Sequence, residues 1–299
     1  MTKRQRATKK TVPQNPVHNV IVISDLHVGC GFGLFTMDKF DRDEGGSYHP
    51  SEMQNTVASW WREFWHEWVP MVCRGEPFCV VCNGDAMDGV HHRSVHQWTH
   101  NLEDQCEAAY KMLSPIVELC EGRYYHIRGT EAHVGKSGQE EERLAKRLNA
   151  IASKEGHHAR WELWMYLGDH LVHFAHHIGV CGSVGYATSA IQKELEQIYV
   201  DSALWCREPP AVVCRSHRHR CNETRVPTAR GFATSTVTAG WQLKTPFAYR
   251  IAGGRITQPQ IGGLLIRSGD EDIYTRPKVW ELDRPQAERP MYANLSNSA

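Results

Sequence analysis

Short apolar runs alternate with longer amphipathic segments through the first half of the chain. The runs have the length of buried strands, and the segments between them repeat apolar residues at helical spacing. The expected strands are 18–24, 77–85 and 123–129, and the expected helices are 51–74, 101–120 and 137–152. The tryptophans of the first helix recur at this spacing, so we interpret them as core residues rather than as a cofactor site.

Strand-like runs dominate the second half, from "ARWELWMYLG" (159–168) to "GGLLIRS" (262–268), and one helix around 186–205 interrupts them. Alternating strands and helices followed by a mainly β segment predict an α/β fold. In this fold two mixed β-sheets pack face to face and helices flank them.

The two ends of the chain differ from the rest. Residues 1–16 open with "MTKRQRATKK", which holds five basic residues and almost no apolar ones, and this composition predicts a disordered basic tail. Residues 283–299 are polar and are expected to form a C-terminal tail. We expect residues 17–282 to form a single domain, which is long but acceptable for an α/β enzyme.

Composition narrows the class of protein. Lys+Arg and Asp+Glu number 34 each, so no excess of positive charge marks the chain as a polyanion binder. No apolar run approaches the roughly 18 residues of a membrane span, and the N-terminus lacks the apolar stretch of a signal peptide. We therefore expect a cytoplasmic chain with no membrane partner, in which the ten cysteines are reduced thiols.

Residues of metal-binding type follow five of the expected strands at the point where each strand ends. Asp25 and His27 follow the first strand, and because they are two residues apart on an extended chain, their side chains point to the same side. The other four strand ends carry Asp85 and Asp88, Glu131 and His133, His176 and His177, and His217 and His219. Open α/β sheets bind ligands at the carboxyl ends of their strands, which favours a shared site.

Four segments, in order along the chain, resemble the motifs of the calcineurin-like metallophosphoesterases. They are "DLH" (25–27), "GDAMD" (84–88), "AHH" (175–177) and "SHRH" (216–219). In the family the corresponding motifs are D-x-H, G-D-x-x-D, a lone histidine and G-H-x-H. The resemblance implies the family fold, a pair of mixed sheets flanked by helices, and hydrolysis of phosphoesters at a dinuclear metal centre.

The resemblance also implies which residues hold the metals. The implied ligands are Asp25, His27 and His219 for one ion, His176 and His217 for a second ion, and Asp85 as the bridge between the two. His177 is the fallback for His176. Mixed imidazole and carboxylate ligands suit transition metals better than magnesium or calcium, which prefer oxygen alone. We therefore expect two divalent transition-metal ions, with manganese first and iron or zinc as alternatives.

The third motif departs from the family, because "GTEAH" (129–133) stands where the family has G-N-H-E/D. Three interpretations stay open. In the one that we favour, Glu131 replaces the asparagine ligand and His133 is the catalytic acid. In the second, Thr130 is a weak ligand and His133 is still the acid. In the third, the site binds metal without catalysis. Asp88, which in the family orients the catalytic histidine, is present and favours retained chemistry.

Two further features suggest other sites. Cys214, His217, His219 and Cys221 in "CRSHRHRC" have the residue types of a small zinc site, although histidines two residues apart fit the usual ligand spacing poorly. His92, in the loop after the second motif, is a candidate for substrate binding.

The substrate class is a separate expectation. "GTEAHVG" (129–135) and "TAGWQLKTPFAYR" (238–250) resemble a phosphoesterase variant of phage and prophage genomes. This resemblance favours a phosphodiester substrate such as nucleic acid. The alternatives are a phosphomonoesterase acting on phosphoprotein or nucleotide, and a metal-stabilised binding module without turnover.

Overall fold

A computed structural model describes residues 16–91, 94–179, 184–229, 231–250, 257–269, 272–283 and 287–288. The expected basic tail, apart from its last residue, and most of the expected C-terminal tail lie outside the described residues. Within these ranges no helix has both the length and the apolar character needed to cross a bilayer.

The larger sheet has six strands. In spatial order they are β13 (Ile273–Glu281), β12 (Gln260–Ser268), β1 (Asn19–Ile23), β4 (Phe78–Asn83), β5 (Tyr124–Ile127) and β6 (Ala159–Arg160). β1, β4, β5 and β6 run parallel to one another, so their carboxyl ends lie along one edge of the sheet. β12 pairs antiparallel with β1 and with β13.

The second sheet has five strands. In spatial order they are β10 (Asn222–Thr228), β11 (Gly231–Val237), β9 (Val212–Arg215), β8 (His170–Ala175) and β7 (Glu162–Leu167). β9 is parallel to both of its neighbours, and the outer pairs are antiparallel. A separate hairpin of β2 (Phe40–Asp41) and β3 (Ser47–Tyr48) lies in the segment after β1.

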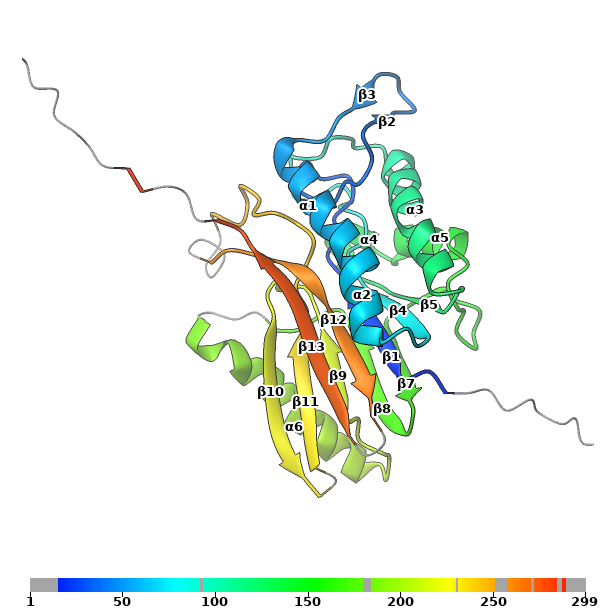
Figure 1. Cartoon of the computed structure of the whole chain (residues 1–299), viewed down its shortest axis with the longest axis vertical. Coiled ribbons are helices and arrows are strands. Elements are labelled where there is room, and N and C mark those ends of the chain that lie inside the picture. The colour runs from blue at the N-terminus through cyan, green and yellow to red at the C-terminus, as the bar shows by residue number, and fades with distance from the viewer. Residues whose placement is uncertain are drawn as a thin grey trace, which may run out of the picture.

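Helices lie outside the two sheets (Figure 1). Near the larger sheet they are α1 (Glu52–Glu63), continued by a π-helical turn (Phe64–Trp68) and α2 (Val69–Cys73), then α3 (Leu102–Leu119), α4 (Glu131–Val134) and α5 (Gln139–Arg147). A 3-10 turn (Val184–Tyr186) leads into α6 (Ala187–Leu204), which packs against β10 and β11. The expected α/β architecture, two mixed sheets flanked by helices, is confirmed.

The alternation of side chains along β1 explains how the layers are held together. Ile21 and Ile23 pack with the helices in one core, which also contains the buried tryptophans of the first helical segment. Val20 and Val22 point the other way and pack against the second sheet in another core. Because both faces of β1 are buried, the strand reads as a continuous apolar run, as buried parallel strands do.

In the two large sheets the sequence analysis missed two strands, β10 and β13, and each contains a proline, Pro227 and Pro277; it also missed the short hairpin strands β2 and β3. Both strands lie at the edge of their sheets. An edge strand tolerates proline because one of its sides has no ladder hydrogen bonds to lose. Their alternating or mostly polar surfaces also lack the apolar run by which the inner strands were recognised.

Candidate metal centre

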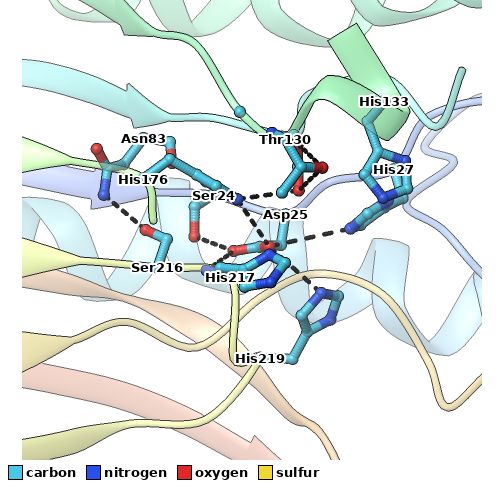
Figure 2. A network of polar contacts seen from close by, with 12 residues as sticks. Ser24, Asp25, His27, Asn83, Thr130, His133, His176, Ser216, His217 and His219 are labelled. Carbon is cyan, nitrogen blue, oxygen red and sulfur yellow. Dashed lines mark hydrogen bonds and ion pairs between the residues drawn. The ribbon is translucent and has the colours of Figure 1, made fainter. Parts of the chain in front are cut away.

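Five loops that follow strands meet at one end of the two sheets. β1, β4 and β5 are adjacent and parallel in the larger sheet, and β8 and β9 are adjacent and parallel in the second. Figure 2 shows that side chains from both sheets, including those of His176, His217 and His219, are directed toward Asp25. The site is therefore assembled across the interface between the sheets.

The described residues contain two groups of side chains that can hold a metal ion and that share Asp25. The inner group consists of Asp25, Asp85, His176 and His217, and the outer group consists of Asp25, His27 and His219. Within each group the potential ligand atoms all lie within 4.8 Å of one another. Asp25 Oδ1 is 3.3 Å from His219 Nε2 and 4.0 Å from His176 Nε2. Asp85 Oδ2 is 3.0 Å from His176 Nε2.

Asp25, rather than Asp85, is the residue common to both groups. The motif resemblance implied that Asp85 is the bridge, and in the structure Asp85 belongs to the inner group alone. The difference arises because the Asp25 carboxylate faces histidines from β1, β8 and β9 at once. Its other oxygen, Oδ2, accepts hydrogen bonds from Ser24 Oγ at 2.6 Å and from the His217 amide at 3.2 Å.

Two of the histidines are oriented by hydrogen bonds from the ring nitrogen that faces away from the centre. His176 Nδ1 donates to the Asn83 carbonyl at 2.7 Å, and His27 Nδ1 donates to Asp88 Oδ1 at 3.1 Å. Such contacts are typical of metal-binding histidines, because they fix the tautomer and leave the second nitrogen free to bind the ion. Asp88 thus orients His27 with its carboxylate. Asn83 was not recognised in the sequence, where it precedes the GD of the second motif.

The atoms that face the centre have only one another as polar neighbours. Asp25 Oδ1, His27 Nε2 and His176 Nε2 are buried and make no well-formed hydrogen bond among the described residues, and their ion-pair contacts are with other candidate ligands. Buried polar atoms are nearly always hydrogen-bonded, so three such atoms pointing into one region fit the donors of a metal site. Carboxylate and imidazole donors together fit a divalent transition metal.

The backbone of these loops is strained. Nine non-glycine residues of the described chain have a positive φ, and five of them are candidate ligands: Asp25, His27, Asp85, His217 and His219. Non-glycine residues seldom adopt this left-handed conformation, and it persists only where the surroundings impose it. The concentration of strain at the candidate ligands marks this region as a functional site.

Glycines make room for the ligands. A Cβ on Gly129 would overlap Asp85 Oδ1, and a Cβ on Gly84 would overlap the His176 ring. A Cβ on Gly240 would lie 2.9 Å from Asp25 Cβ and 3.1 Å from His219 Nδ1. The motif resemblance pointed to two of these glycines, but the role of Gly240, far along the chain, is visible only in the structure.

The charges of the inner group complement one another. Burial would raise the pKa of the Asp25 carboxyl, but the imidazoles of His219 and His176 hold it below its usual value. Burial would lower the pKa of His176, but Asp85 and Asp25 raise it to about 10. Burial, and then the charge of His176, lower the pKa of His217 to about 4. The raised pKa places a proton, and with it a positive charge, on His176 between the two carboxylates, and a cation bound there would replace this proton.

The third motif is arranged differently from the interpretation that we favoured. Thr130 lies against the inner group, where its amide donates to Asp85 Oδ1 at 2.7 Å and its hydroxyl donates to the same oxygen at 3.2 Å. Glu131 is exposed and belongs to neither ligand group. The structure does not bring Glu131 to the ligands because α4 begins at this residue, with Thr130 as its N-cap. The placement corresponds to the second interpretation.

His133 lies beside the outer group. Its ring contacts the His27 ring edge-on, with centroids 4.5 Å apart, and its Nδ1 donates to the Asp88 carbonyl at 2.6 Å. Asp88 therefore orients His133 through its backbone. His27, Asp88 and His133 also bring ligand-type atoms within 4.8 Å of one another. The hydrogen bond between His27 and Asp88 accounts for part of this proximity.

The remaining sequence candidates have different outcomes. His92 lies outside the described residues. His177 is exposed and stacks on His217, whereas His176 belongs to the inner group. Cys214 is buried in the core between the sheets, so the alternative zinc site of Cys214, His217, His219 and Cys221 is not among the metal groups of the described residues.

Comparisons with known proteins find similar structures but no similar sequences. No protein-family model matches the chain, and no curated protein is significantly similar to it. A structure of Vacuolar Protein Sorting 29 from Cryptosporidium parvum is 10% identical, with a TM-score of 0.39, and the match covers 90% of this chain and 100% of that one. A structure of a predicted phosphoesterase from Streptococcus pneumoniae is 11% identical, with a TM-score of 0.32, and the match covers 88% of this chain and 98% of that one.

A structure of Vps29 from Entamoeba histolytica in complex with zinc is 9% identical, with a TM-score of 0.35, and the match covers 87% of this chain and 98% of that one. The three matches each span most of this chain and nearly all of the other. At such identities and TM-scores, nothing about the activity, metal or partners of this chain follows from them.

Proposed function

We propose that this chain hydrolyses phosphoesters with the help of two divalent transition-metal ions. The observation that carries the proposal is the pair of ligand groups that share Asp25 and whose inward-facing atoms make no well-formed hydrogen bond among the described residues. Two adjacent ions at such a centre polarise a phosphoryl group and make water more acidic. Manganese is the proposed metal and iron or zinc are the alternatives, because imidazole and carboxylate ligands occur together.

Asp25 and Asp85 are the carboxylates that we propose would hold the ions, Asp25 in both groups and Asp85 in the inner group. Asp25 is common to both groups. Asp85 contacts His176, and its charge also reaches the outer group. Burial lowers the pKa of His27, but the hydrogen bond to Asp88 and the charge of Asp85 raise it above its ordinary value. Two carboxylates between two cations would reduce the repulsion between the cations.

His133 is the proposed proton carrier. Burial lowers its pKa to about 4 in spite of the nearby Asp85, so the ring is neutral at pH 7. Because Nδ1 donates to the Asp88 carbonyl, Nε2 carries the lone pair. Nε2 would take up a proton from solvent and deliver it to the oxygen of the leaving group, which departs as the alcohol. Thr130 positions Asp85, and Glu131 has no part in binding the metal.

Two hollows, one lined by His133 and one by the residue after His219, are the basis for proposing a phosphodiester substrate. A groove of about 520 Å³ opens at His133 and is lined by Val90, Leu102, Ala132 and Lys136 among others. A second hollow of about 380 Å³ is lined by Arg220, which follows His219, and by Gln260, whose amide donates to the His219 carbonyl. A diester carries two organic substituents, and each hollow can receive one of them. Nucleic acid is the proposed substrate.

A binding module without turnover is the second candidate. It is favoured by the third motif, in which the asparagine and the histidine of the family are replaced by Thr130 and Glu131. In this case the two ions would stabilise the loops of the centre, and the grooves would bind a partner that is released unchanged.

The test compares substrates on the manganese-loaded chain. Bis-para-nitrophenyl phosphate reports diester hydrolysis, para-nitrophenyl phosphate reports monoester hydrolysis, and single- and double-stranded DNA test the proposed substrate. The controls are the chelated chain and Asp25→Asn. We expect the diester to be hydrolysed faster than the monoester. Faster hydrolysis of the monoester would support a phosphomonoesterase, and two bound ions with no hydrolysis of any substrate would support the binding module.

A further inference from the structure

Glu141 is a buried acid that belongs to neither ligand group. It lies on α5, and its side chain is inaccessible to solvent. Oε1 accepts the backbone N–H of Ala86 at 3.0 Å, and Oε2 accepts the backbone N–H of Gly129 at 2.6 Å. His126 Nε2 lies 3.6 Å from Oε1. Burying a carboxylate is costly unless hydrogen bonds compensate for the lost water, so these two bonds explain how the residue is tolerated.

The two donors to Glu141 are next to the residues of the inner group. Ala86 follows Asp85, and Gly129 precedes Thr130, which holds the Asp85 carboxylate through its amide and its hydroxyl. One carboxylate thus connects the loop after β4 with the loop after β5. Both loops contribute to the position of the Asp85 side chain.

The loop after β1 is attached to the same structure. The amides of Asp25, His27 and Val28 donate to the carbonyls of residues 84, 85 and 86, at 3.0, 3.1 and 3.0 Å. Glu141 is therefore connected to three of the five loops of the centre, directly to those after β4 and β5 and through the loop after β4 to that after β1. Asp25, His27 and Asp85 have left-handed backbone conformations, which depend on their surroundings.

We propose that Glu141 is a positioning residue of the metal centre. Its carboxylate holds the loops after β4 and β5 at a fixed separation, and through them it sets the geometry of Asp85 and, less directly, of Asp25 and His27. This inference rests on the proposed function for the identity of the site. It adds a residue that contacts neither the ions nor the substrate and that the sequence motifs do not include.

Glu142 provides a matched control on the same helix. Its carboxylate also accepts two backbone N–H groups, those of His158 and Ala159, both at 2.9 Å. These residues lie at the start of β6, away from the ligand groups. The two glutamates thus make the same kind of backbone contact, and only Glu141 makes it with the loops of the centre; Glu142 also accepts from the Arg128 side chain at 3.1 Å.

The test compares Glu141→Gln with Glu142→Gln. Each of the two N–H groups bonds to a different oxygen of Glu141, and a glutamine amide can replace only one of these oxygens because its NH2 group donates rather than accepts. Manganese affinity is measured by competition with a chelator. We expect Glu141→Gln to weaken binding by about 10–100-fold, the range for residues that position metal ligands, and Glu142→Gln to leave it unchanged. If Glu141→Gln does not fold, Glu141→Asp is used, since its shorter side chain cannot reach both amides.

A second readout does not require metal. In the chelated chain, hydrogen exchange at the Ala86 and Gly129 amides should accelerate in Glu141→Gln, and exchange at the His158 and Ala159 amides should accelerate in Glu142→Gln. Equal manganese affinity in the wild-type chain and Glu141→Gln would overturn the inference. A wild-type chain that binds no manganese would overturn the proposed function, and unchanged exchange at Ala86 and Gly129 would then overturn the positioning role as well.

Discussion

The inner and outer ligand groups use the same residue types in different surroundings. In the inner group, His176 is 1% exposed, its ring is held by a backbone carbonyl, and Asp85 is held by Thr130. In the outer group, the His219 side chain is 20% exposed, and His133 lies beside His27 at the opening of a groove. Each group contains one half-buried histidine, His217 or His219, so the difference is that Asn83 and Thr130 hold the inner group whereas the outer group lies beside a groove lined by His133.

The largest effect is expected where the two groups meet. Asp25→Asn removes a charge from both groups, so we expect the content of bound metal to fall and activity to drop on the order of 10³-fold or more. Elemental analysis and hydrolysis of the diester reporter measure the two effects. Asp201→Asn, an exposed position on α6, is the control. A greater loss of metal in Asp85→Asn would make Asp85 the principal bridge, as the motif resemblance implies.

The second largest effect is expected at His133, and it separates proton transfer from metal binding beside the outer group. His133→Ala should lower turnover by about 10²–10³-fold while metal content stays the same, because Nε2 transfers the proton to the leaving group and binds no ion. The loss should be smaller with para-nitrophenyl esters, whose leaving group departs without a proton. Glu131→Ala should leave the metal content unchanged, and its effect on turnover of these esters should be much smaller than that of His133→Ala. Loss of metal in Glu131→Ala would restore the interpretation in which Glu131 is a ligand.

A smaller effect is expected from the residue that orients His27. Asp88→Asn weakens the contact to His27 Nδ1, and we expect metal affinity to fall by about 10–100-fold, mainly at the outer group. Gln97→Ala removes only the amide that donates to the other oxygen of Asp88 at 2.7 Å, so its effect should be smaller. Titration with cobalt, followed by its absorption spectrum, would show whether the variant binds one of the two ions less tightly. Equal weakening of both ions would contradict the separation of the groups.

The smallest effect concerns the packing behind the inner group. Gly129→Ala introduces a methyl group that overlaps Asp85 Oδ1, and overpacking of this kind costs about 1–3 kcal/mol in the free energy of unfolding. Gly179→Ala is the control, because a Cβ there meets no atom within 4 Å. Chemical denaturation of the chelated proteins measures both. If the two variants are equally stable, the inner group is less rigid than its contacts indicate.

Patterns of apolar residues were sufficient to predict the inner strands and the long helices. β1, β4 and β5 fall within the expected ranges, and so do α3 and α6. These strands and helices are buried on one or both faces, which requires long apolar runs or apolar residues at helical spacing, and both are local properties of the sequence. β10 and β13 were missed because an edge strand needs only one bonded neighbour, so its sequence can be polar and can contain proline.

The order of ligand-type residues after strands predicted the five loops whose side chains the structure brings together, and that they form a metal site stays a prediction. The positions of Glu131 and Asp88 were less accessible to this reasoning. Whether residue 130 or 131 faces Asp85 depends on where α4 begins, and the two alternatives differ by a rotation of about 100° around the helix axis. That Asp88 uses its carboxylate for His27 and its carbonyl for His133 depends on the packing of loops from three strands.

The sequence by itself determined the fold class, the five strand ends and the residue types found there, because strand periodicity and ligand-type residues can be recognised within short segments. Only the tertiary structure decided that Asp25 is shared by both groups, that Gly240 makes room for it, and that Glu141 ties two loops together. These relations join residues up to 215 positions apart, since Asp25 and Gly240 come from opposite ends of the chain. Contacts of this kind arise when the two sheets pack, and no local pattern encodes them.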